Sequence, residues 1–186
     1  MKEPVEKTFI QISVFIFFLF FVFGLLSAMA YPDGANLIIN RVDVFFGFAK
    51  NLNPFFLVLF IFLNNAIKAF LAMLFGIIFG LVPIFFLIAN GFILGVFSLV
   101  EFDKGWTRLV AGILPHGIFE LAGVFLATGY GMWMGYHFFK FIFFRERFSP
   151  VFKKAMKKYF RVILPILFLA SLVEVFITPI FIKLTK

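Results

Sequence analysis

Residues 55–100 read FFLVLFIFLNNAIKAFLAMLFGIIFGLVPIFFLIANGFILGVFSLV and carry a single charged side chain, that of Lys68. As one helix they would be about 69 Å long, whereas the hydrocarbon core of a bilayer is about 30 Å thick. The stretch is therefore long enough to cross a membrane twice. Pro83 suits the first turn of a helix, so the sequence predicts spans at about 56–80 and 83–101.

The rest of the chain shares this apolar character. Its 186 residues are 63% hydrophobic and 14% charged, and 35 of them are phenylalanine. A water-soluble domain of this size needs more polar side chains to cover its surface. Cysteine is absent from the sequence, which excludes a disulfide framework and thiolate chemistry. We therefore expect a single transmembrane domain over residues 1–186.

Three more apolar stretches predict spans at about 9–30, 107–136 and 162–182. The first of them ends in Ala28-Met29-Ala30, which resembles a signal-peptidase site. Its apolar run is longer than the core of a typical signal peptide, so we favour a retained anchor over a cleaved signal. The predicted fold is all-α and polytopic, with about five transmembrane helices.

Positive charge is concentrated in one segment. The formal net charge is +8, and residues 136–161 contribute +7 of it through eight basic residues and Glu146. Cytoplasmic loops carry an excess of lysine and arginine, so with five spans we expect a cytoplasmic N-terminus and a C-terminus outside the cell membrane. The basic patch should face the anionic inner leaflet or a partner protein, not nucleic acid. It comprises Arg145, Arg147, Lys153, Lys154, Lys157, Lys158 and Arg161.

Two segments between spans have the pattern of amphipathic helices. After Ser149-Pro150, apolar side chains recur at helical spacing among lysines, which predicts a basic amphipathic helix over residues 149–161 on the inner membrane surface. A second, less charged stripe lies in the first outer loop. The first stripe comprises Phe152, Met156, Tyr159 and Phe160, and the second comprises Ile38, Val42, Phe45, Phe46 and Ala49.

Small residues recur along three of the predicted spans. Such residues allow the backbones of membrane helices to approach closely, so they predict helix–helix contacts rather than chemistry. They comprise Gly112, Gly123, Ala127 and Gly131 on the fourth span, Ala72, Gly76 and Gly80 on the second, and Gly91 and Gly95 on the third.

Seven polar or ionisable residues lie inside the predicted spans, where such groups are costly and usually face the protein interior. Their depths, about 12–20 Å from the outer ends of the spans, place them in one layer. His116 and Glu120 share a helix face next to Pro115, which should bend the helix, and Thr178 lies one turn beyond Glu174. This intramembrane polar cluster comprises Asn64, Asn65, Lys68, Asn90, His116, Glu120 and Glu174.

Three interpretations of the cluster remain open. It can be a static polar clamp between helices, a proton- or ion-linked pathway, or a metal site. Lys68 carries one positive charge against two glutamates, so protonation of His116 would restore neutrality. A metal would find only His116 and Glu120 at ligand spacing, because His137 lies about 30 Å further along the helix. From the sequence we therefore expect no metal and no cofactor.

Catalytic motifs are absent from the sequence. It contains no His-Glu-x-x-His zinc motif, no Gly-x-Ser-x-Gly elbow and no phosphate-binding loop. Asn90-Gly91-x-x-x-Gly95 is not a dinucleotide fingerprint, since no βαβ unit surrounds it. The outer loops are too short for an extramembrane enzyme domain, so we do not expect an enzyme.

The same residues resemble the stage II sporulation protein M family, over most of the chain from the second span onward. The resemblance is carried by Asn64-Asn65, Gly76-x-x-x-Gly80, Asn90-Gly91-x-x-x-Gly95 and, most specifically, Leu114-Pro115-His116-Gly117-Ile118-Phe119-Glu120-Leu121. It implies an integral membrane protein of a family found in bacteria and archaea, whose namesake resembles a scaffold for peptidoglycan-degrading partners during sporulation. It also implies a shared role, without an established chemistry, for Asn64, Asn65, Asn90, His116, Gly117 and Glu120.

Together these patterns favour a non-enzymatic membrane scaffold or assembly component that acts as a homo-oligomer or in a membrane complex. The alternative is a small ion- or proton-coupled transporter or channel that uses the intramembrane polar cluster. A third hypothesis, export of an envelope component alongside an ATPase, would require a soluble partner at the basic patch.

Overall fold

The computed structural model describes residues 6–102 and 105–185, apart from the side chains of residues 43, 45, 46, 48 and 50. Within these residues every regular element is a helix. Along the chain they are α1 (Glu6–Ala30), α2 (Pro32–Phe46), η1 (Gly47–Asn51), α3 (Pro54–Leu74), η2 (Phe75–Ile77), α4 (Leu81–Phe102), α5 (Trp106–Phe144), α6 (Ser149–Lys158), η3 (Tyr159–Ile163), α7 (Leu164–Leu172), η4 (Val173–Ile177) and α8 (Thr178–Leu184).

Five helices are long and apolar enough to cross a membrane, which confirms the predicted all-α fold and its number of spans. They are Glu6–Ala30, Pro54–Ile77, Leu81–Phe102, Trp106–Phe144 and Ser149–Leu184. One predicted boundary is wrong at the end of α5, which continues to Phe144 instead of ending near residue 136. Residues 137–144 contain neither glycine nor proline, and the helix stops only where Arg145 adopts a left-handed conformation (φ 55°).

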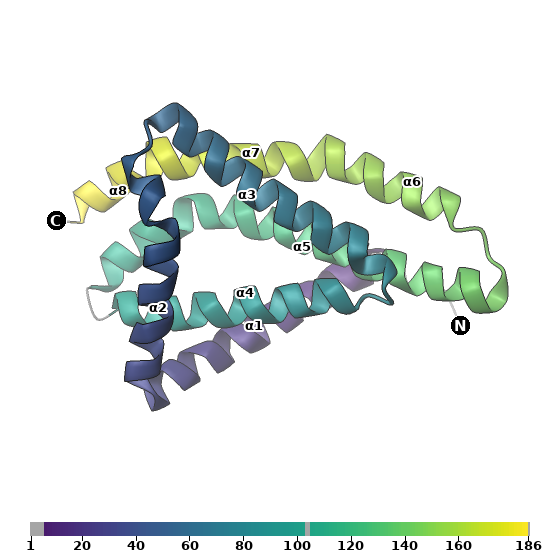
Figure 1. Cartoon of the computed structure of the whole chain (residues 1–186), viewed down its shortest axis with the longest axis horizontal. Coiled ribbons are helices and arrows are strands. Elements are labelled where there is room, and N and C mark those ends of the chain that lie inside the picture. The colour runs from purple at the N-terminus through teal and green to yellow at the C-terminus, as the bar shows by residue number, and fades with distance from the viewer. Residues whose placement is uncertain (1–5, 103–104, 186) are drawn as a thin grey trace.

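The helices lie roughly along one long axis, except α2, which crosses the others at one end of the bundle (Figure 1). The N-terminal end of α1 and the hairpin between α5 and α6 lie toward the opposite end from the C-terminus (Figure 1). This hairpin extends beyond the ends of α1, α3 and α4. An odd number of spans accounts for the separation of the two termini.

The turn between the second and third spans uses left-handed backbone. Phe79 and Gly80 have φ angles of 49° and 76°, and together they reverse the chain before α4. Pro83 lies in the first turn of α4, where its missing N–H has no intrahelical partner to lose. The break predicted at Pro83 thus occurs three to four residues earlier, at the residue pair whose conformation ends the preceding helix.

Close backbone contact holds the helices together at several glycines. Added methyl groups on Gly91 or Gly95 of α4 would overlap the carbonyl oxygens of Phe17 and Phe21 in α1. On the other side of the bundle, a methyl group on Gly76 would overlap the backbone of Gly131 in α5. The small-residue stripes therefore mark helix contacts, as their spacing predicts. Gly112 differs. Outside its own helix, the atom nearest to an added methyl group would be Ile182 Cδ1, at 3.9 Å.

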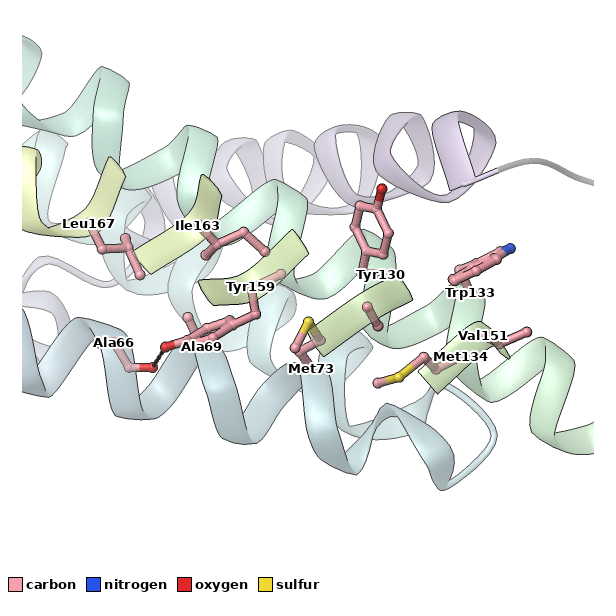
Figure 2. Packing of buried hydrophobic residues seen from close by; sticks show 12 residues of the cluster. Ala66, Ala69, Met73, Tyr130, Trp133, Met134, Val151, Tyr159, Ile163 and Leu167 are labelled. Atoms are coloured by element: carbon pink, nitrogen blue, oxygen red, sulfur yellow. Dashed lines mark hydrogen bonds between the residues drawn. The ribbon is translucent and has the colours of Figure 1, made fainter. Parts of the chain in front are cut away.

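The largest buried cluster joins α3, α5 and the last helix (Figure 2). Ala69 and Met73 of α3 pack with Met134 of α5, and Tyr159 fits between the two helices. The hydroxyl of Tyr159 donates a 2.7 Å hydrogen bond to the carbonyl oxygen of Ala66, so its polar end is satisfied inside the core (Figure 2).

The basic segment at 149–161 is not a separate surface helix, because α6, η3, α7, η4 and α8 follow one another without a break. Val151, Ala155 and Tyr159 are buried, and Met156 packs against the same core. Much of the apolar side of the segment thus packs against α5 and α3, whereas Phe160 is 57% exposed. α2 does form the separate helix expected in the outer loop, although the side chains of Phe45 and Phe46 lie outside the described residues.

Candidate functional site

Three ionisable side chains from two spans converge in the first half of α5. His116 and Glu120 lie one turn apart on α5, and Glu174 comes from η4 in the last span. One ligand atom from each, an imidazole nitrogen or a carboxylate oxygen, lies within 4.8 Å of the other two. All three side chains are half-buried. We call this group the His116–Glu120–Glu174 site.

The backbone around the site is irregular in both helices. Pro115 precedes His116 inside α5, which stays helical across it and bends in its first third (Figure 1). Glu174 lies in η4, a π-helical turn of the kind often found at functional sites. In such a turn the hydroxyl of Thr178 reaches back five residues and donates to the carbonyl oxygen of Val173 at 3.3 Å.

The orientation of the His116 ring follows from this hydrogen bond. Nδ1 of His116 lies 3.1 Å from Oγ1 of Thr178. When the single hydroxyl hydrogen of Thr178 points to Val173, its oxygen can accept a hydrogen bond from the tautomer of His116 that carries its proton on Nδ1. A neutral imidazole then carries its lone pair on Nε2. The sequence placed Thr178 on the same face as Glu174, but its contact with His116 joins two helices and has no signature in the local sequence.

Lys68 of α3 is a positively charged residue that acts on this site. It interacts electrostatically with Glu120, and Glu120 interacts in turn with Glu174. Fully ionised, the two glutamates would carry two negative charges against one on Lys68. Within a low-dielectric region such an imbalance is unfavourable unless a proton or a cation offsets it.

Two cavities approach the site from different sides and share Glu120 and Glu174 in their walls. The first has a volume of about 460 Å³ and the second about 320 Å³. The first is also lined by Asn64 and Asn65 of α3, and the second by Asn90 of α4 and His116. The pair Glu120–Glu174 therefore stands between two cavities that could hold water or ions.

Asn64 and Asn65 thus lie in the wall of one cavity and Asn90 and His116 in the wall of the other, while Lys68 interacts electrostatically with Glu120. The asparagines contribute to the cavity walls. Asn64 donates to Asn65 at 3.3 Å, and Asn90 donates to the carbonyl oxygen of Phe86 in its own helix at 2.7 Å. They shape the cavities, whereas His116, Glu120 and Glu174 form the site.

Most residues of the basic patch are exposed, and Lys154 is both exposed and paired with another helix. Lys154 forms an ion pair with Glu6 of α1 and lies 5.4 Å from the ring centroid of Trp133, so it connects α6 to the bundle. Lys140 pairs with Glu146 at 2.7 Å across the α5–α6 hairpin. Lys158 is half-buried, and the exposed members of the patch include Arg145, Arg147, Lys153, Lys157 and Arg161.

Comparison with known proteins agrees with the motif at Pro115–Glu120. The model of the family described as Stage II sporulation protein M matches residues 13–179. An uncharacterized protein of Methanocaldococcus jannaschii is 28% identical over 184 residues, which cover 96% of this chain and 96% of that protein. No solved structure matches the chain. With the family match extending from the first span to the last, the chain belongs to the stage II sporulation protein M family.

Proposed function

We propose that the protein is a non-enzymatic membrane scaffold that holds a partner protein, or a second copy of itself, at the α5–α6 hairpin. The observation that carries the proposal is the length of α5. Its 39 residues correspond to about 58 Å of helix, whereas the hydrocarbon core is about 30 Å thick. The excess at its C-terminal end gives the protein a projecting arm.

The surface of the hairpin has the composition of a protein interface. Phe143 and Phe144 are 61% and 67% exposed at the end of α5, and Arg145 and Arg147 follow them directly. Aromatic residues and arginine are enriched where protein interfaces are buried. The ion pair Lys140–Glu146 braces the hairpin, so these side chains are presented on a fixed support.

The packing of the bundle also favours a scaffold over a protein that changes shape. At Gly91, Gly95 and Gly76 the backbones of neighbouring helices are so close that not even a methyl group fits. Helices locked at this distance are held together as units, α1 with α4 and the second span with α5. A rigid frame is the property that an assembly component needs.

Photo-cross-linking in native membranes tests the proposal. A photoreactive phenylalanine analogue at position 144 should form discrete protein adducts, including a dimer of this chain if the partner is a second copy. The matched control is the same analogue at Phe85 of α4, which is 66% exposed on the apolar surface and should react with lipid. Absence of protein adducts at position 144, together with a monomer and no co-purified partner in mild detergent, would contradict the scaffold.

A second function, a proton- or ion-coupled pathway, is favoured by one specific observation. Two cavities meet at Glu120 and Glu174, and a carboxylate between two water-accessible spaces can take up a proton or cation on one side and release it on the other. Proteoliposomes with the purified protein should then show flux that Glu120→Gln abolishes without lowering the unfolding temperature. Wild-type protein without flux under proton and cation gradients would exclude this function.

A further inference from the structure

We propose that His116, Glu120 and Glu174 bind a divalent transition-metal ion of the Zn²⁺ class. This inference goes beyond the scaffold and does not depend on it. The site supplies three ligand atoms from two spans, within 4.8 Å of one another. One imidazole nitrogen with two carboxylate oxygens is a set that zinc sites use, in which three protein ligands leave a fourth position open.

The spacing of the three ligand atoms suits the metal. Zinc–nitrogen and zinc–oxygen bonds of about 2.1 Å place ligand atoms about 3.4 Å apart in a tetrahedral site. Since the three atoms already lie within 4.8 Å, they need to approach by no more than about 1.4 Å. Rotation about the flexible side-chain bonds of Glu120 and Glu174 can supply this, with both helix backbones in place.

The orientation of His116 is a second and independent argument. In the tautomer that carries its proton on Nδ1, Thr178 Oγ1 accepts from Nδ1 and the lone pair lies on Nε2. A histidine that ligates a metal through one nitrogen usually donates from the other to a fixed acceptor, which sets both its tautomer and its direction. Thr178 provides that acceptor, and Val173 fixes the hydroxyl of Thr178 in turn.

Charge provides a third argument. Glu120 interacts with Glu174 as well as with Lys68, and a divalent cation between the two carboxylates would remove their mutual repulsion. Both carboxylates line the two cavities, so an ion and its remaining water ligands have space beside the site. Lys68 then competes with the metal for Glu120, which makes its removal a diagnostic change.

The donor set also indicates the class of metal. Imidazole favours zinc and its neighbours in the first transition series, whereas magnesium and calcium prefer sites composed of oxygen ligands. The sequence has no thiolate to select copper(I). The sequence alone disfavoured a metal because only His116 and Glu120 were visible as ligands, and the third ligand lies 54 residues further along the chain, at Glu174.

Metal binding by the full chain in detergent tests the proposal. After treatment with a chelator, the wild-type protein should bind one equivalent of Zn²⁺ by metal analysis. Co²⁺ should give the absorption spectrum of a low-symmetry site. His116→Gln and Glu174→Gln should lower the affinity for Zn²⁺ at least about 100-fold, since loss of an outer partner alone costs 10- to 100-fold. His137→Gln, a change to the other histidine in the chain, is the matched control and should bind like wild type.

Two further variants separate a metal site from a polar clamp. Lys68→Met should bind Zn²⁺ several-fold more tightly, because a competing positive charge is removed. Thr178→Val should weaken binding about 10- to 100-fold while keeping all three ligands. Zn²⁺ binding that none of the ligand variants changes, or Mg²⁺ and Ca²⁺ binding as tight as that of Zn²⁺, would overturn the proposal. Ligand variants that lose metal binding only because they unfold would also overturn it. The unfolding temperatures of the metal-free proteins show whether this has happened. The scaffold is tested separately at position 144.

Discussion

Gly135 has no side chain, so the backbone of α5 can contact the backbone of the turn that precedes α4. A methyl group there would overlap the backbone nitrogen of Gly80 and the carbonyl oxygen of Gly76. Backbone atoms cannot rotate away as a side chain can, so we expect Gly135→Ala to lower the free energy of unfolding by about 1–3 kcal/mol. Reversible unfolding in mixed detergent micelles measures the change.

Gly112 is the matched control in the same helix. Its added methyl group would have only Ile182 Cδ1 nearby, at 3.9 Å. Because alanine favours the helix more than glycine does, Gly112→Ala should leave stability unchanged or raise it by about 0.5–1 kcal/mol. Equal losses in the two variants would mean that close helix contact at Gly135 does not contribute to stability.

The hydroxyl of Tyr159 is a second point at which one atom connects two spans. Removing it leaves the carbonyl oxygen of Ala66 without this 2.7 Å hydrogen bond inside the core. We expect Tyr159→Phe to lower the free energy of unfolding by about 1 kcal/mol. Tyr31→Phe, at a tyrosine that is 74% exposed, removes a hydroxyl near α2 and should change stability by less than the error of the same unfolding assay.

At the scale of elements, the ion pair between Glu6 and Lys154 connects the start of α1 to α6. The side chain of Lys154 is 54% exposed, and exposed pairs contribute little. In a double-mutant cycle with Glu6→Gln and Lys154→Gln we expect a coupling energy of about 0.2–1 kcal/mol, which falls as salt is added. The neighbouring Lys153→Gln should show no coupling to Glu6→Gln. A coupling that salt does not weaken would contradict a solvent-screened ion pair.

The elements also show which features the sequence could predict. Each span is indicated by an apolar run, and the small-residue stripes of the second and third spans mark contacts because close approach requires small residues. The surroundings of the basic segment could not be predicted in this way, because they depend on other parts of the chain. The basic segment has a local amphipathic pattern, but whether its apolar side meets lipid or protein depends on α5 and α3.

The meeting of Glu174 with His116 could be predicted only in part. Depth along each helix places both residues in one layer, as counting at 1.5 Å per residue allows. Depth says nothing about rotation around the helix axis, and the direction of Glu174 depends on the π-helical turn at Val173–Ile177. Periodicity with 3.6 residues per turn cannot anticipate such a turn.

At the scale of the whole molecule, the N-terminus and the α5–α6 hairpin lie toward one end and the C-terminus toward the other (Figure 1). The basic residues of the hairpin predict that its end is cytoplasmic. Alkaline phosphatase fused to the C-terminus should therefore be active, and a green fluorescent protein fused there should stay dark. The same fluorescent protein at the N-terminus is the control and should fluoresce. A bright C-terminal fusion would reverse the predicted orientation.

The π-helical turn at Val173–Ile177 has the form left when one extra residue enters an ordinary helix. Because such a turn absorbs its extra residue, deleting Val175 would restore regular winding and leave the helix on either side nearly in phase. The last span would keep its packing upstream, where Ile163 and Leu167 are buried, and Thr178 would still face His116 downstream. The turn is therefore a place where this family member can lose one codon without disturbing the helices on either side.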